Sequence, residues 1–241
     1  MIKLENVVLA SPEQMEFIIE GMRNPMNSWE KSDSDICNPT EKCYYSCNKV
    51  GCVDADHFHL GENDHSLMQR LSNAGIEHRK YMRMMPVYVR ITAPLYWWKE
   101  FDTYKIGTVA NSCSTMHKIA EKEFTLEDFS TEHLASQTRQ VLEITIDDLN
   151  DSRSIYLKTK NKGDWWQMIQ LLPSSYNQTR NVMMNYEVLA NIYRQRKNHK
   201  LDEWREFCKW IESLPYSELI VDGEEIKYYS DNKEVTTDEQ N

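Results

Sequence analysis

The sequence is poor in glycine and proline, with seven of each in 241 residues. That scarcity excludes a low-complexity or collagen-like chain. No apolar run reaches 18 residues, so no transmembrane helix is expected. Lys3 and Glu5 interrupt the short apolar stretch near the start, which is unlike a secretory signal. We therefore expect a cytoplasmic protein whose six cysteines are reduced.

Positive charge is also scarce, with 28 Lys and Arg against 38 Asp and Glu and a net charge of −10. This balance argues against bulk nucleic acid as a partner, because such binding relies on Lys and Arg against phosphates. It leaves small anionic ligands open, since a local cluster can oppose the overall charge. We expect one domain over 1–241, with a Cys-rich insertion at about 31–62 and an acidic tail that frays from about 230.

Two stretches have strand character. Residues 87–91 are β-branched and aromatic, and residues 4–9 are predicted to form a second strand. Ser11, followed by Pro12 and then Gln14, is typical of the start of a helix.

The C-terminal half has helical periodicity. Two apolar stripes separated by a polar knuckle predict a long helix over 180–214, broken near Asn198. Residues 151–164 are polar and are predicted to form a solvated loop, whereas 219–221 have the composition of a strand.

Residues 97–114 hold the densest mixture of large apolar and small polar side chains. Trp97 and Trp98 stand beside a Lys-Glu pair, a Tyr-Lys pair and several hydroxyl and amide residues. Such a mixture suits a pocket that holds a flat ring together with an anion. The alternative is an amphipathic helix followed by a surface turn, with both tryptophans in the core or at a subunit interface.

Four cysteines, Cys37, Cys43, Cys47 and Cys52, lie within one short irregular segment. Four thiols so close together in a reducing compartment favour a structural zinc site. The intervening lengths of five, three and four residues lack the paired spacing of a zinc knuckle, so free or buried thiols are the alternative.

Further candidate motifs lie in two segments, 77–118 and 171–204. The first segment contains Glu77-His78, Lys99-Glu100, Tyr104-Lys105, Thr108, Asn111 and Ser114. The second contains Leu172-Pro173, Asn185, Asn191 and Arg196. Together they resemble the flavin-dependent thymidylate synthases over about half of the chain.

The chain departs from the pattern of that family at several positions. The family has an Arg-His-Arg triplet, which is degraded here because Thr103, Tyr104 and Lys105 stand in its place. Ser112 replaces the Glu after Asn111, and Met116-His117 replace the closing Arg-Tyr. Ile169 stands where an Arg is expected before Leu-Pro. Several of these residues hold phosphate or flavin in the family, and a Lys is not equivalent to an Arg fork.

The resemblance implies an α/β (α+β) fold, with a twisted, mainly antiparallel sheet packed with long helices. It implies a homotetramer with active sites between subunits. The implied reaction is the reductive methylation of dUMP, with FAD, NADPH and methylenetetrahydrofolate. The cofactor supplies the electron chemistry, and the protein supplies orientation and electrostatics.

The resemblance also implies a role for each matched residue. Arg196 is the catalytic candidate, facing the pyrimidine carbonyls and stabilising developing negative charge. The substrate-binding candidates are Lys99, Glu100, Thr108, Ser112 and Ser114. The cofactor-binding candidates are His78, Tyr104, Lys105, Asn111, Asn185 and Asn191.

Other interpretations remain open. The chain could be an inactive nucleotide- or flavin-binding protein on the same fold, given its lost arginines, or a structural protein organised by a zinc knuckle. Arg196 could be a basic helix end that faces the dipole. Asn185 could be a helix cap, and His78 an exposed helix residue.

Overall fold

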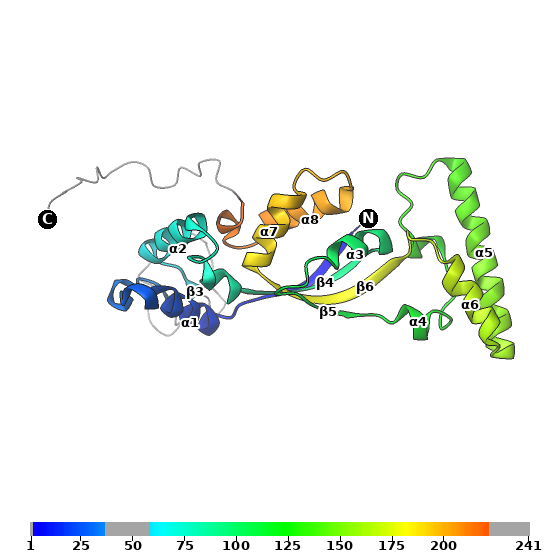
Figure 1. Ribbon diagram of the computed structural model, residues 1–241, viewed down its shortest axis with the longest axis horizontal. Coiled ribbons are helices and arrows are strands. Elements are labelled where there is room, and N and C mark those ends of the chain that lie inside the picture. Colours follow the sequence, from blue (N-terminus) through cyan, green and yellow to red (C-terminus); the bar gives the residue numbers. More distant parts are fainter. Residues whose placement is uncertain (1, 37–57, 222–241) are drawn as a thin grey trace, which may run out of the picture.

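The computed structural model describes residues 2–36 and 58–221. Its centre is a four-stranded antiparallel sheet in the order β1-β4-β6-β5 (Figure 1). These strands are β1 (Lys3–Leu9), β4 (Pro86–Pro94), β5 (Val109–Ser112) and β6 (Asn177–Asn185). A second sheet pairs β2 (Asp35–Ile36) with β3 (Phe58–His59). The predicted mixed fold with a mainly antiparallel sheet is confirmed.

The helices form three groups around the sheet (Figure 1). Beside one end lie α1 (Pro12–Arg23) and α2 (Glu62–Ala74). Over the sheet lie α3 (Leu95–Phe101), α7 (Tyr186–Arg196) and α8 (Asp202–Glu212). Toward the other end come α4 (Thr115–Lys118) and the hairpin of α5 (Ser136–Thr159) and α6 (Lys162–Leu171). The 3-10 turns are η1 (Asn24–Met26), η2 (Trp29–Lys31), η3 (Lys80–Arg83), η4 (Leu126–Asp128) and η5 (Ser217–Leu219).

Strand β4 shows why one face of the sheet is buried. Its side chains alternate, so that Val87, Val89 and Ile91 are buried while Tyr88 and Arg90 between them are exposed. The buried row packs in one core with the aromatic side chains of α3 and α8. Those aromatic residues are Trp97, Trp98, Phe101, Trp204 and Phe207, all at most 1% exposed. Trp97 and Trp98 are therefore core residues and not the walls of a ligand pocket.

The opposite face of the sheet carries an exposed apolar row. Val8 pairs with Tyr88, Tyr88 with Met183, and Met183 with Val109, so their side chains share one face. Val8, Tyr88 and Val109 are 57%, 46% and 62% exposed. Contiguous exposed apolar side chains mark a surface suited to association.

The strands over 4–9 and 87–91 and the helix after Ser11 are confirmed. The Ser11 side chain accepts a hydrogen bond from the backbone of Gln14, and the Gln14 side chain accepts one from the backbone of Ser11. This reciprocal capping fixes the start of α1.

The predicted helix over 180–214 is wrong at its start. Residues up to Asn185 belong to β6, which pairs with β4 along its whole length, and α7 begins only at Tyr186. The pairing with β4 overrides the local helical pattern. The break near Asn198 is confirmed, because α7 ends at Arg196 and α8 begins at Asp202.

Two further predictions are wrong. The predicted loop over 151–164 is helical to Thr159, because α5 packs against α6 and Tyr156 joins their shared apolar cluster. The predicted strand over 219–221 is instead the place where the turn η5 ends, at Leu219. Leu219 and the following Ile220 are buried in the main core.

Some predictions fall on undescribed parts of the chain. Cys37, Cys43, Cys47 and Cys52, and the acidic tail from about 230, lie outside the described residues. Among residues 2–36 and 58–221, no helix combines the length and apolar character needed to cross a membrane.

Candidate functional site

Arg196, the last residue of α7, lies at the centre of a polar cluster. Its Nε donates to the Tyr104 hydroxyl at 2.8 Å, and its Nη1 donates to Glu100 Oε2 at 2.8 Å. The guanidinium lies over the Trp204 ring, 4.8 Å from its centroid. We call Glu100, Tyr104, Arg196 and Trp204 the arginine cluster. It unites three residues that the sequence proposed as site residues.

The cluster extends along α7 through directed hydrogen bonds. The Tyr104 hydroxyl donates to Gln195 Oε1 at 2.9 Å, and Gln195 Nε2 donates to Asn191 Oδ1 at 2.9 Å. Asn191 is thus linked to Arg196 through two intervening side chains. The network orients the guanidinium before any ligand arrives.

A second group of candidates meets at the beginning of α7. Asn185 Oδ1 accepts from the Val188 backbone at 3.0 Å, so Asn185 is the helix cap. Gly107 has φ +76°, and a Cβ there would lie 3.1 Å from Asn185 Nδ2. The segment before β5 therefore passes close to this helix end at a position that favours glycine. Beside it, Thr108 Oγ1 is buried with no hydrogen-bond partner among the described residues.

His78 lies near the same helix end. Its neighbour Arg79 is buried and forms an ion pair with Glu187 in the first turn of α7, with Nε and Oε2 2.8 Å apart. His78 itself is about half exposed and lies shortly before η3. His78 is thus an exposed residue, and its contact with flavin stays a prediction.

The other candidates that the structure describes in this part of the 99–114 segment are exposed. Asn111 and Ser112 are exposed on the edge strand β5, paired with Asn181 and Arg180. Lys99 and Lys105 are exposed and form no ion pair with any described residue.

Thr108 and Ser114 flank β5 on opposite sides. They are six positions apart, which is roughly 20 Å in an extended chain. One small ligand cannot touch both residues of the same chain. The substrate-binding candidates are therefore split within a single subunit.

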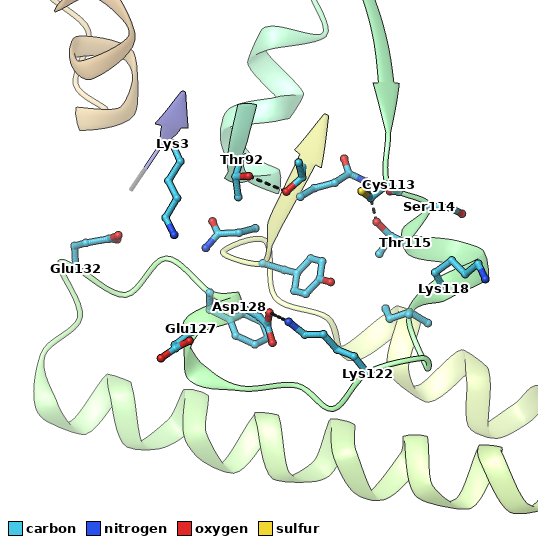
Figure 2. Close-up of a pocket in the computed structure, with 16 residues that line it drawn as sticks. Lys3, Thr92, Cys113, Ser114, Thr115, Lys118, Lys122, Glu127, Asp128 and Glu132 are labelled. Carbon is cyan, nitrogen blue, oxygen red and sulfur yellow. Dashed lines mark hydrogen bonds and ion pairs between the residues drawn. The ribbon is translucent and has the colours of Figure 1, made fainter. Parts of the chain in front are cut away.

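Ser114 borders a pocket of about 400 Å³ near the end of the sheet (Figure 2). Its hydroxyl accepts from the His117 backbone at 3.1 Å and so caps α4. The pocket lies where β4 ends, β6 begins and α4 starts. We call it the sheet-end pocket; it is lined mainly by Lys3, Thr92, Cys113, Ser114, Thr115, Lys118, Lys122, Asp128, Tyr176 and Gln178.

The charges of the sheet-end pocket are mixed. Figure 2 shows Lys122 reaching Asp128, and this hydrogen bond raises the pKa of the Lys122 ammonium. Burial raises the pKa of the Tyr176 phenol in the same wall, so it remains a neutral hydrogen-bonding group. Lys118 is paired with Glu121 on the rim. The pocket offers polar contacts but no concentrated positive charge.

The structure adds residues that the sequence reasoning missed. Trp204 appeared only as part of an apolar stripe, yet its indole Nε1 donates to Glu100 Oε2 at 2.8 Å. His199, in the polar knuckle, has Nε2 3.4 Å from the same oxygen. Both residues follow Arg196 within eight positions, which was a signal, but their common partner Glu100 lies about 100 positions earlier.

The described residues show no grouped metal ligands, and the buried thiol Cys208 is unsuited to nucleophilic chemistry. Among residues 2–36 and 58–221, no three His, Cys, Asp or Glu side chains are grouped to hold a metal ion. Burial raises the pKa of the Cys208 thiol to about 12, so it is protonated and unsuited to act as a nucleophile. Zinc binding by Cys37, Cys43, Cys47 and Cys52 stays a prediction.

Solved structures share this architecture over most of the chain. The flavin-dependent thymidylate synthase ThyX from Helicobacter pylori, complexed with FAD and dUMP, matches with a TM-score of 0.59 and 16% identity. The match covers 92% of this chain and 98% of that one. The fold is that of ThyX. A second structure of that enzyme with FAD and dUMP matches equally, covering 97% of its chain.

A UMP/dUMP methylase, PolB from Streptomyces cacaoi bound with 5-Br dUMP, also shares the ThyX-like fold. It matches with a TM-score of 0.52 and 10% identity, covering 88% of both chains. No family model and no curated protein matches the sequence. At these identities the similarity to ThyX establishes the fold and not the chemistry.

The arginine cluster leaves one edge of the guanidinium free of hydrogen bonds to described residues. Arg196 Nη2 makes no hydrogen bond with a described residue and is not among the buried unpartnered atoms, so it faces solvent. An exposed guanidinium edge can donate hydrogen bonds to an oxygen acceptor. The flavin candidates meet only in part, because His78 and Asn185 lie near one end of α7 while Asn111 lies on β5.

Proposed function

We propose that this protein is a divergent flavin-dependent thymidylate synthase. It binds dUMP and methylates C5 reductively, with reduced FAD, methylenetetrahydrofolate and NADPH. The proposal is carried by the match of nearly the whole chain to ThyX with FAD and dUMP. The UMP/dUMP methylase on the same fold supports the same class of substrate.

Arg196 is the central residue of the proposed mechanism. Its exposed Nη2 donates to a pyrimidine carbonyl and stabilises the negative charge that develops as C5 becomes nucleophilic. The Tyr104 hydroxyl and the Trp204 ring hold the guanidinium in one orientation. When bound, the flavin supplies the reducing electrons.

The other candidates keep their proposed roles around this centre. Lys99, Glu100, Thr108, Ser112 and Ser114 are assigned to the nucleotide. His78, Tyr104, Lys105, Asn111, Asn185 and Asn191 are assigned to the cofactor. In the absence of the family's arginines, the exposed Lys99 supplies positive charge for the nucleotide phosphate and the exposed Lys105 supplies it for the cofactor.

We further propose a homotetramer with sites between subunits. The candidates Thr108 and Ser114 lie roughly 20 Å apart along one chain, so a nucleotide that uses both kinds of contact needs a second copy. The exposed row Val8, Tyr88 and Val109 gives an apolar surface for that association. Light scattering of purified protein tests the assembly, and a stable monomer would contradict it.

A second candidate function is nucleotide binding without turnover. It is favoured by the ion pair between Arg196 and Glu100, which partly neutralises the cation assigned to transition-state charge. The loss of the family's arginines at Thr103 and Ile169 points the same way.

The deciding experiment combines three measurements on purified full-length protein. They are the flavin absorption band, the affinity for dUMP by calorimetry, and dUMP-dependent NADPH oxidation with methylenetetrahydrofolate. The synthase is expected to give all three signals. Flavin and dUMP binding without oxidation would favour the binding protein, and the absence of both would overturn both functions.

A further inference from the structure

Glu100 is the acceptor at which the arginine cluster converges. Its Oε2 accepts from Arg196 Nη1 and from Trp204 Nε1, each at 2.8 Å. His199 Nε2 lies 3.4 Å from the same oxygen. Donors from α7, from α8 and from the turn between them thus fix one carboxylate. Because carboxylate and guanidinium are both partly shielded from solvent, each partly offsets the charge of the other.

The contacts of Arg196 leave one defined edge for a ligand. Nε is used by Tyr104 and Nη1 by Glu100, while the Trp204 ring covers one face of the guanidinium. The side chain is 18% exposed, and Nη2 has no partner among the described residues. This edge can donate hydrogen bonds, but a carboxylate stands beside it. That negative charge would repel an incoming anion strongly and a neutral carbonyl only weakly.

We propose that Glu100 determines the charge of the group that Arg196 accepts. Its carboxylate makes the arginine select an uncharged carbonyl, such as those of a pyrimidine ring, and reject phosphate and carboxylate groups. The inference rests on the proposed function in assuming that the ligand meets Arg196. It revises the role that the sequence gave to Glu100, which acts through Arg196 as a positioning residue.

The test replaces the charge and keeps the shape. Glu100→Gln retains an oxygen acceptor for Arg196 and Trp204 but removes the negative charge. Inorganic phosphate serves as the anion probe, and its affinity is read from the rise in unfolding temperature with phosphate concentration. We expect E100Q to bind phosphate about tenfold more tightly than the wild type.

Two controls separate charge selection from a general effect. Glu143→Gln removes an exposed glutamate that pairs with Arg139 within α5, with Oε1 and Nε 3.3 Å apart. E143Q should behave as the wild type toward phosphate. The double variant Glu100→Gln with Arg196→Gln should lose the gain, because the gain acts through Arg196. Equal phosphate affinity in E100Q, E143Q and wild type would overturn the proposal.

A second variant keeps the test decisive if E100Q does not fold. Arg196→Gln in the otherwise wild-type protein should weaken binding of 2′-deoxyuridine and leave phosphate affinity unchanged. Weaker phosphate binding in R196Q would show that the wild-type arginine already accepts anions, against the proposal. If the wild type binds no dUMP while E100Q gains phosphate affinity, the proposed function fails and the charge selection stands.

Discussion

The arginine cluster and the sheet-end pocket both contain proposed site residues, yet they are built in different ways. In the cluster, Trp204 is fully buried, Tyr104 is 9% exposed, and directed hydrogen bonds fix the guanidinium. In the pocket, the lysines Lys118 and Lys122 are 63% and 71% exposed and pair with acids at the rim. Exposed pairs hold geometry weakly. We therefore expect substitutions in the cluster to have larger effects than substitutions in the pocket.

The largest expected effect is on the stability of the cluster. Trp204→Ala removes a fully buried indole that packs 4.7 Å from Trp97 and donates to Glu100. The free energy of unfolding should fall by about 4 kcal/mol. Denaturant titration measures it, with Trp166→Ala in α6, 41% exposed, as the control that loses about 1 kcal/mol. Equal losses would mean that the cluster is no more tightly packed than the hairpin.

The next effect is on activity. Arg196→Lys keeps the charge but removes the planar fork that binds Tyr104 and Glu100 together. The rate of dUMP-dependent NADPH oxidation should fall about a hundredfold, or on the order of 3 kcal/mol. Flavin content should not change, because the proposed contact is to substrate. Arg194→Lys, at an exposed position on the same helix, is the control. Unchanged rates in R196K would remove Arg196 from the mechanism.

Asp64 is a buried carboxylate remote from the proposed ligand contacts. It serves as a reference for how much a fully hydrogen-bonded carboxylate contributes to the stability of the fold. Burial disfavours the charged form of Asp64, but hydrogen bonds from Ser34, Ser32, Arg23 and the Asp33 backbone outweigh it and lower its pKa. Its stabilisation is therefore present above the ordinary carboxyl pKa of about 4 and is lost as pH falls.

Asp64→Asn tests this reference. The variant should lose about 2 kcal/mol of unfolding free energy at pH 7, and its difference from wild type should shrink as pH falls below about 4. Thermal unfolding across pH 3–7 measures the difference. Asp35→Asn, at a half-exposed position, should show neither effect. A difference that stays constant with pH would show that the charge of Asp64 is not what stabilises the fold.

The smallest effect is expected in the sheet-end pocket. Ser114→Ala removes the cap of the short helix α4 and a wall of the pocket. Stability should fall by about 1 kcal/mol, and affinity for dUMP, measured by calorimetry, by less than about tenfold. A loss of dUMP affinity much larger than tenfold would reverse the comparison and make the pocket the main determinant.

Sequence patterns predicted the structure correctly where neighbouring residues determine it. The Ser11 cap, the alternation of β4 and the polar break after Arg196 each follow from neighbouring residues. Local signals failed where pairing at a distance decided the outcome, as in β6, whose residues up to Asn185 have a helical pattern but complete a sheet. They failed again in α5, which packing on α6 extends through a polar stretch to Thr159.

By itself the sequence determined the residue types, the spacing of Asn185, Asn191 and Arg196 on one segment, and the resemblance from which the mixed fold was inferred. Only the tertiary structure decided which partner each of these residues has. Glu100 meets Arg196 and Trp204 because α3, α7 and α8 pack together on one face of the sheet, and no sequence spacing encodes that meeting. Thr108 and Ser114 are separated for a different reason, because the extended strand β5 lies between them and each of its residues adds more than 3 Å.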